Sequence, residues 1–152
     1  MPRSPLGRGA VRSERVLAVE RVLNVVHREA DRFAITVRGH LIEVDQPVQD
    51  GGGDLAATPT ELFVASLASC VAYYARRYLA RHELPEEGLA VRAGYTIVPR
   101  PARVGEISIE IELPAGVPPD RHAALLAVAS HCTVHNSLES PPTVKIEVAV
   151  EP

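Results

Sequence analysis

The sequence predicts a single α+β domain in which antiparallel sheets pack on a long buried central helix and a second, shorter helix. Strand-like segments follow one another in runs and do not alternate one for one with helices. A helix-start signal opens a long apolar segment near the middle of the chain. The 152 residues, 46% of them hydrophobic, suit one domain with its own core and exclude a disordered chain. The expected element order is β-β-(β)-α-β-β-α-β.

The N-terminal third predicts two or three strands in hairpin order. Val16–His27 and Phe33–Asp45 are rich in Val, Ile and Leu, and Arg38-Gly39-His40 interrupts the second segment as a turn. Gln46–Ala57 contains three consecutive glycines and two aspartates, so it is a loop. It is long for a compact domain, which makes it a candidate functional loop.

The strongest local signal is a capping box. Thr58 occupies the N-cap, Pro59 the first helical position and Glu61 the third, so side chains and backbone amides can satisfy one another. The first half of the following helix, Leu62–Ala75, is apolar or small all round, which predicts burial on every side. The second half turns amphipathic, and Pro85 ends the helix.

The C-terminal half predicts two strands, a helix and a last strand. Leu89–Val98 and Val104–Leu113 are the two strands, and the second alternates Ile with Glu or Ser, which indicates one buried and one solvated acidic face. Pro118-Pro119-Asp120 opens a helix that ends near Cys132, and a helical turn can follow it. Thr143–Val150 alternates again and predicts the last strand.

Charge and composition narrow the partners and the compartment. A net charge of −3 gives no reason to expect nucleic acid as a partner. The longest uncharged stretch, Leu62–Ala75, is shorter than the ~20 residues of a membrane span. Residues 1–13 form a basic tail without the apolar stretch of a secretion signal, so we expect a cytosolic protein whose domain covers residues 14–152.

Two cysteines are the residues most able to carry chemistry. Cys70 lies in the apolar half of the central helix and Cys132 at the end of the second helix. Two cysteines are too few for a disulfide scaffold or a tetrathiolate zinc site. Their positions alone leave three interpretations open: the two thiols are packed in the core, they bind a metal, or they form a redox pair. A metal pair would use Cys132-x-x-His135, with His131 and Cys70 nearby.

A serine hydrolase would have to use Ser66 or Ser69. The sequence has no G-x-S-x-G motif, and both serines fall inside the predicted buried helix. We therefore place this possibility below the thiol-based ones.

Two motifs together resemble one family. TPTELFVASLASC at residues 58–70 and ASHCTVHNSL at residues 129–138 are similar to the OsmC/Ohr family of thiol-dependent hydroperoxidases, over roughly Arg28 to Val150. The resemblance implies an intertwined homodimer that reduces organic hydroperoxides. It implies Cys70 as the peroxidatic cysteine and Cys132 as the resolving cysteine, which form a disulfide. It also implies reduction by an external dithiol, such as a lipoylated protein, and no metal, flavin or haem cofactor.

The family also supplies an arginine that activates the first cysteine. A free thiol titrates near ~8.5 and burial raises that value, so a cation is needed. Cys70 lies too far into its helix to gain from the N-terminus. Arg32 is our first choice from the N-terminal hairpin region, with Arg28 and Arg38 as alternatives.

An acid that holds this arginine follows the proline directly in the family. Here Thr60 follows Pro59, and Glu61 comes one position later, a rotation of about 100° on a helix. Glu61 and Cys70 are nine residues apart, which is about 13–14 Å along a helix. Glu61 can therefore serve Cys70 only from a partner chain. The departure at Thr60 keeps an alternative function open: an OsmC-like stress protein without efficient turnover that binds a small apolar ligand near Cys70.

Overall fold

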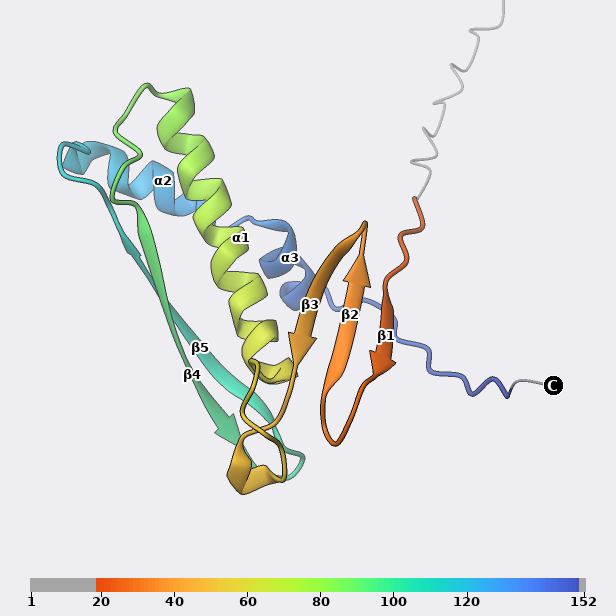
Figure 1. The fold of residues 1–152 in the computed structure, drawn as a ribbon. Helices are drawn as coiled ribbons and strands as arrows, with labels where there is room; N and C mark the ends of the chain where they lie inside the picture. The colour runs from red at the N-terminus through yellow and green to blue at the C-terminus, as the bar shows by residue number, and fades with distance from the viewer. Residues whose placement is uncertain (1–18, 151–152) are drawn as a thin grey trace, which may run out of the picture.

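Two antiparallel sheets flank a long helix in the computed structural model, which describes residues 19–150 (Figure 1). The strands are β1 Asn24–His27, β2 Phe33–Val37, β3 His40–Val44, β4 Ala90–Val98 and β5 Arg103–Glu112. The helices are η1 Val48–Asp50, α1 Pro59–Arg81, η2 Pro119–Arg121, α2 His122–Ala129 and α3 Thr133–Glu139. The α+β class is confirmed.

The first sheet has the order β1-β2-β3. Arg38 and Gly39 both have positive φ, 49° and 82°, as a tight two-residue hairpin turn between β2 and β3 requires. The predicted turn is therefore confirmed. The first strand begins at Asn24, later than predicted, and residues 16–18 lie outside the described part of the chain.

The start of α1 is the predicted capping box. The Glu61 backbone N–H donates to Thr58 Oγ1 at 3.1 Å, and the Thr58 backbone N–H donates to Glu61 Oε2 at 2.7 Å. These bonds satisfy amide groups that the first turn of a helix leaves without partners. They fix where the helix begins, next to the glycine-containing loop.

The prediction that the first half of α1 is buried on every side is wrong for the single chain. Val64, Leu67 and Val71 are buried, but Phe63 is 41% exposed and Tyr73, further along the same helix, is 54% exposed. One face of α1 packs on β4, β5, α2 and α3, while the opposite face has no cover within residues 19–150.

β4 and β5 form a long antiparallel hairpin. Its isoleucines at 107, 109 and 111 are half-buried and its glutamates at 106, 110 and 112 are exposed, as the alternation predicts. The half-buried face packs against the core cluster that α1 and α2 share. Leu79, Leu125, Ala75, Ala129 and Cys132 lie in this cluster and are at most 2% exposed.

The last third matches the prediction in its helices and differs from it in its last strand. The helix expected to end near Cys132 ends at Ala129, three residues earlier, and the helical turn expected after it is α3, which begins at Thr133. Thr143–Val150 forms no strand, because nothing in residues 19–150 pairs with its backbone. Ile146 and Val148 are 89% and 91% exposed. The tail at residues 1–13 lies outside the described residues.

Candidate active site

The structure brings Cys70 and Cys132 together from two separate elements. Cys70 is half-buried on α1, and Cys132 is fully buried between α2 and α3. Burial raises the pKa of the Cys132 thiol, and the neighbouring Cys70 thiol raises it further. Both cysteines are free thiols. Solvent can therefore reach the Cys70 thiol, whereas the Cys132 thiol lies in the core behind it.

Cys132 caps α3. Its backbone is extended, with φ −70° and ψ 155°, and its Sγ accepts a hydrogen bond from the His135 backbone N–H at 3.4 Å. The N–H groups of His135 and Val134 lower the pKa of the thiol, against the larger effect of burial. A sulfur at a helix cap is placed by backbone geometry, so its direction does not depend on a flexible side chain.

His135 packs beside this cap, where a metal pair would have used its ring. Its Nδ1 is hydrogen-bonded to the Ser130 carbonyl, and its Nε2 lies 3.9 Å from Glu139 Oε1. Residues 19–150 contain no group of three or more His, Cys, Asp or Glu side chains arranged to hold a metal ion. The His135 ring is thus engaged with the protein on both sides.

Two hollows lie near His135, which lines both. The first, of about 210 Å³, lies between α1, β5 and α2 and is walled by Leu67, Val71 and the three half-buried isoleucines of β5. The second, of about 340 Å³, reaches Phe63 and Glu139. Leu67 and Val71 also belong to the core cluster that holds Cys132, so the first hollow is an apolar space at the border of that cluster, and neither cysteine lines it.

Arg32 does not bind Cys70 within the chain. Its Nη1 donates to Glu29 at 2.8 Å and its Nη2 donates to Glu43 at 3.1 Å. Arg28 and Arg38, the alternatives, are exposed on the same sheet, in the β1–β2 connection and in the β2–β3 turn. The first sheet thus keeps all three candidate arginines among its own residues.

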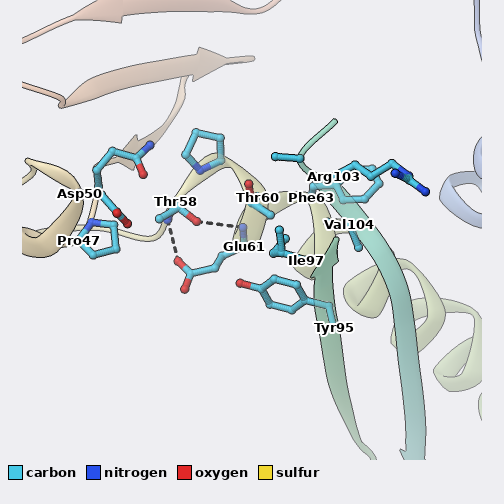
Figure 2. Close-up of a pocket in the computed structure, with 13 residues that line it drawn as sticks. Pro47, Asp50, Thr58, Thr60, Glu61, Phe63, Tyr95, Ile97, Arg103 and Val104 are labelled. Carbon is cyan, nitrogen blue, oxygen red and sulfur yellow. Dashed lines mark hydrogen bonds between the residues drawn. The ribbon is translucent and has the colours of Figure 1, made fainter. Parts of the chain in front are cut away.

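Glu61 lines a hollow that neither cysteine lines. The open pocket that it lines has a volume of about 700 Å³ and is drawn in Figure 2. Tyr95, Ile97 and Arg103 from the β4–β5 hairpin line the same pocket, and the Glu61 carboxylate turns back to the Thr58 backbone. The structure does not unite Glu61 with Cys70, as their spacing along one helix requires.

Asp45 is a structural residue that the sequence reasoning missed. It is 1% exposed and accepts hydrogen bonds from the backbone N–H groups of Gln46, Gly53 and Leu55. The pKa of Asp45 lies below its usual value, chiefly because of the hydrogen bond from Leu55. The bonds from Gln46 and Gly53 and the charge of Arg32 lower this pKa further, whereas burial opposes them. Asp45 thereby shapes the loop that leads to Glu61, and an aspartate directly before a glycine-rich loop was the available signal.

The fold and the site together define an α+β protein with a pair of neighbouring thiols at a helix junction. The family model described as OsmC-like protein matches residues 51–147, well over half of the chain, and the protein belongs to this family. The predicted resemblance is confirmed. No curated protein sequence matches the chain.

Several solved structures share the fold of this chain. A Psychrobacter arcticus protein, described as an osmotic stress induced and detoxification response protein, shares 22% identity with a TM-score of 0.73, over 80% of this chain and 90% of that one. An OsmC-like protein from Mycoplasma pneumoniae shares 15% identity with a TM-score of 0.70, over 82% and 91%. The Legionella pneumophila organic hydroperoxide resistance protein OsmC, also described as a predicted redox protein and regulator of sulfide bond formation, shares 16% identity with a TM-score of 0.61, over 80% and 91%.

Membrane insertion through a helix finds no support in the described part of the chain. None of the helices within residues 19–150 combines the length and the apolar character that crossing a bilayer needs.

Proposed function

We propose that this protein reduces organic hydroperoxides with Cys70 and Cys132 as its dithiol pair, as part of a stress or detoxification response. The observation that carries the proposal is that a half-buried free thiol, Cys70, packs against the core cluster that holds a fully buried one, Cys132. Family membership and the names of the Legionella and Psychrobacter proteins support the same chemistry.

The different burial of the thiols assigns the order of events. Cys70 is the accessible thiol, so its thiolate attacks the distal oxygen of the hydroperoxide. The O–O bond breaks, the alcohol leaves with a proton, and Cys70 becomes a sulfenic acid. Cys132 is a poor first nucleophile, because burial raises its pKa and separates it from solvent.

The buried thiol then completes the turnover. The Cys132 thiolate attacks the Cys70 sulfur, the S–S bond forms, the S–O bond breaks, and the leaving hydroxide takes up the proton that Cys132 released. An external dithiol, with a lipoylated protein as the expected reductant, restores both thiols by exchange. A reducing cytosol suits this cycle, because it keeps the resting pair reduced.

We extend the proposal to a homodimer that completes the site. Phe63 and Tyr73 expose apolar surface on α1, and Ile146 and Val148 do so on the unpaired C-terminal segment. Exposed apolar side chains of this kind suit an interface with a second chain. Within one chain Arg32 and Glu61 do not reach Cys70, so in the proposed dimer they come from the partner. A protein that remains monomeric by light scattering at micromolar concentration would exclude the shared site.

Single-turnover oxidation tests the reaction. Reduced protein is mixed with cumene hydroperoxide, and free thiols are counted against time in wild type, Cys70→Ser and Cys132→Ser. We expect fast loss of two thiols, no loss in Cys70→Ser, and arrest at a dimedone-reactive sulfenic acid in Cys132→Ser. Peptide mapping should find the link between residues 70 and 132 within one chain. Oxidation no faster than that of free cysteine would overturn the proposal.

A second function is favoured by the apolar hollow of about 210 Å³ that borders the core cluster of Cys132. In this alternative, the protein binds a small apolar ligand there without efficient turnover. The pKa of Cys70 separates the two functions, because catalysis requires it to lie below that of a free thiol. It can be measured from the pH dependence of iodoacetamide alkylation, in the presence and absence of an apolar probe such as cumyl alcohol.

A further inference from the structure

The turn between α2 and α3, residues 130–133, is tied to α3 by two side chains. The His135 ring binds the Ser130 carbonyl through Nδ1, and the Asn136 Nδ2 donates to the His131 carbonyl at 3.3 Å. A carbonyl oxygen can only accept, so Nδ1 of His135 carries the proton of that bond. The turn that presents Cys132 is therefore anchored from the following helix.

The His135 backbone also holds this turn. Its N–H donates to Cys132 Sγ at 3.4 Å, and the Asn136 N–H donates to the Cys132 carbonyl at 2.9 Å. His135 thus contacts Cys132 through its backbone and Ser130 through its ring.

The sulfur needs this donor because its surroundings are otherwise apolar. Cys132 is 0% exposed and packs in the cluster with Leu67, Leu125 and Ala129. Burial raises the pKa of its thiol, and the N–H groups of His135 and Val134 act in the opposite direction. A resolving cysteine reacts as the thiolate, so whatever keeps these N–H groups on the sulfur favours the resolving step.

We propose that His135 is a positioning residue for disulfide formation: its ring bond to the Ser130 carbonyl keeps its own N–H on Cys132 Sγ and the thiol toward Cys70. This role of His135 rests on the proposed function only where a hydroperoxide oxidises Cys70, because other oxidants can also drive formation of the disulfide. Glu139 lies beyond Nε2, on the far side of the ring from Ser130, and plays no part in the tie.

Variants at residue 135 test the ring bond. His135→Leu removes it. His135→Asn keeps an amide N–H close to the position of Nδ1, whereas His135→Gln moves the amide outward toward Glu139. Ser137→Ala is the matched control, because it removes a hydrogen bond of similar type on α3, from Ser137 Oγ to the Thr133 carbonyl at 2.9 Å, without touching Cys132.

Two rates are measured after one equivalent of cumene hydroperoxide and, separately, of diamide: the first modification of Cys70 and the closure of the disulfide. We expect closure to slow about tenfold in His135→Leu and His135→Gln, to stay within about twofold of wild type in His135→Asn and Ser137→Ala, and the first step to be unchanged in all. In a Cys70→Ser background, the pH profile of Cys132 alkylation should move to higher pH for His135→Gln and not for His135→Asn. A merely structural role would lower the melting temperature without moving this profile.

Closure at the wild-type rate in His135→Gln would overturn the assignment, and so would His135→Asn as slow as His135→Gln. The comparison of His135→Asn with His135→Gln tests the role of the ring bond even if His135→Leu fails to fold. If the hydroperoxide leaves Cys70 unmodified but diamide gives the expected ranking, the proposed function fails and the role of His135 stands.

Discussion

The Arg32 guanidinium joins the connection before β2 to strand β3, since its Nη2 donates to Glu43 at 3.1 Å while its Nη1 donates to Glu29 at 2.8 Å. Its Nε is buried and has no hydrogen-bond partner within residues 19–150. Two carboxylates therefore fix the direction of this cation, in a sheet that does not bring it to the thiols of its own chain.

Arg32→Gln should slow the oxidation of Cys70 by at least about tenfold at pH 7, because loss of a nearby cation raises a thiol pKa by one unit or more. The matched controls are Arg28→Gln and Arg38→Gln, which lie on the same sheet. Because the Arg32 side chain is half-buried between Glu29 and Glu43, the variant should also lose some stability, which urea denaturation measures separately. Stopped-flow oxidation with cumene hydroperoxide measures the rates. A larger effect from Arg28 or Arg38 would move the activating role to that residue.

Thr58→Ala and Glu61→Gln separate the capping role of Glu61 from a role toward the partner's thiols. Thr58→Ala removes the acceptor of the Glu61 N–H and should cost about 1 kcal/mol in the free energy of unfolding. Glu61→Gln keeps an oxygen that can accept from Thr58, so it should cost less. Only Glu61→Gln should slow Cys70 oxidation. Urea denaturation measures the stability of both variants. If the two variants oxidise Cys70 at equal rates while their stabilities differ as expected, Glu61 acts only in the capping box.

Cys132 should resist alkylation while Cys70 reacts. Cys132 is 0% exposed, and burial raises its pKa above that of an exposed cysteine thiol. In the native state we expect iodoacetamide at pH 8 to label Cys70 first, and mass spectrometry of the peptides reads the order. Preferential labelling of Cys132 would contradict the assignment of roles.

The same shift has a consequence for alkaline stability. Because the folded-state pKa of Cys132 is raised, the unfolded chain releases this proton first, and stability is lost as pH rises from about 9 through the folded value. Below that range the contribution is fully present. Cys132→Ala should flatten the alkaline fall in the free energy of unfolding, measured with urea between pH 7 and 11. An unchanged slope would assign the fall to other groups.

Asp45 should set part of the acid stability. Its folded-state pKa lies below that of an exposed aspartate, so the unfolded chain binds the proton first and stability is lost as pH falls below about 5. Above that range the contribution is present in full. Asp45→Asn should lower the urea midpoint at pH 7, because the side chain no longer offers two acceptor oxygens to three N–H groups.

The variant should also weaken the dependence of the midpoint on pH between 5 and 3. Asp50→Asn, at an exposed carboxylate in the same loop, is the control and should leave both quantities close to wild type. A pH dependence of Asp45→Asn identical to that of wild type would show that the acid transition depends on other carboxylates.

Local patterns in the sequence determined the elements that depend on neighbouring residues. The start of α1 followed from Thr58 and Glu61, because a capping box is closed within one turn. The hairpin turn followed from Arg38-Gly39, and the faces of β5 from its alternation. The motifs around the cysteines identified the family, because a family is identified from the order of its residues and not from their arrangement in space.

The tertiary structure alone decided what depends on distant partners. The sequence indicated a helix end near Cys132, but the burial of its thiol at the cap of α3 depends on the packing of α1 and α2 around it. Thr143–Val150 has the pattern of a strand, but a strand exists only where another backbone accepts its hydrogen bonds. The contact of Cys70 with Cys132 and the three N–H groups on Asp45 arise in the same way, from packing between segments that no local pattern brings together.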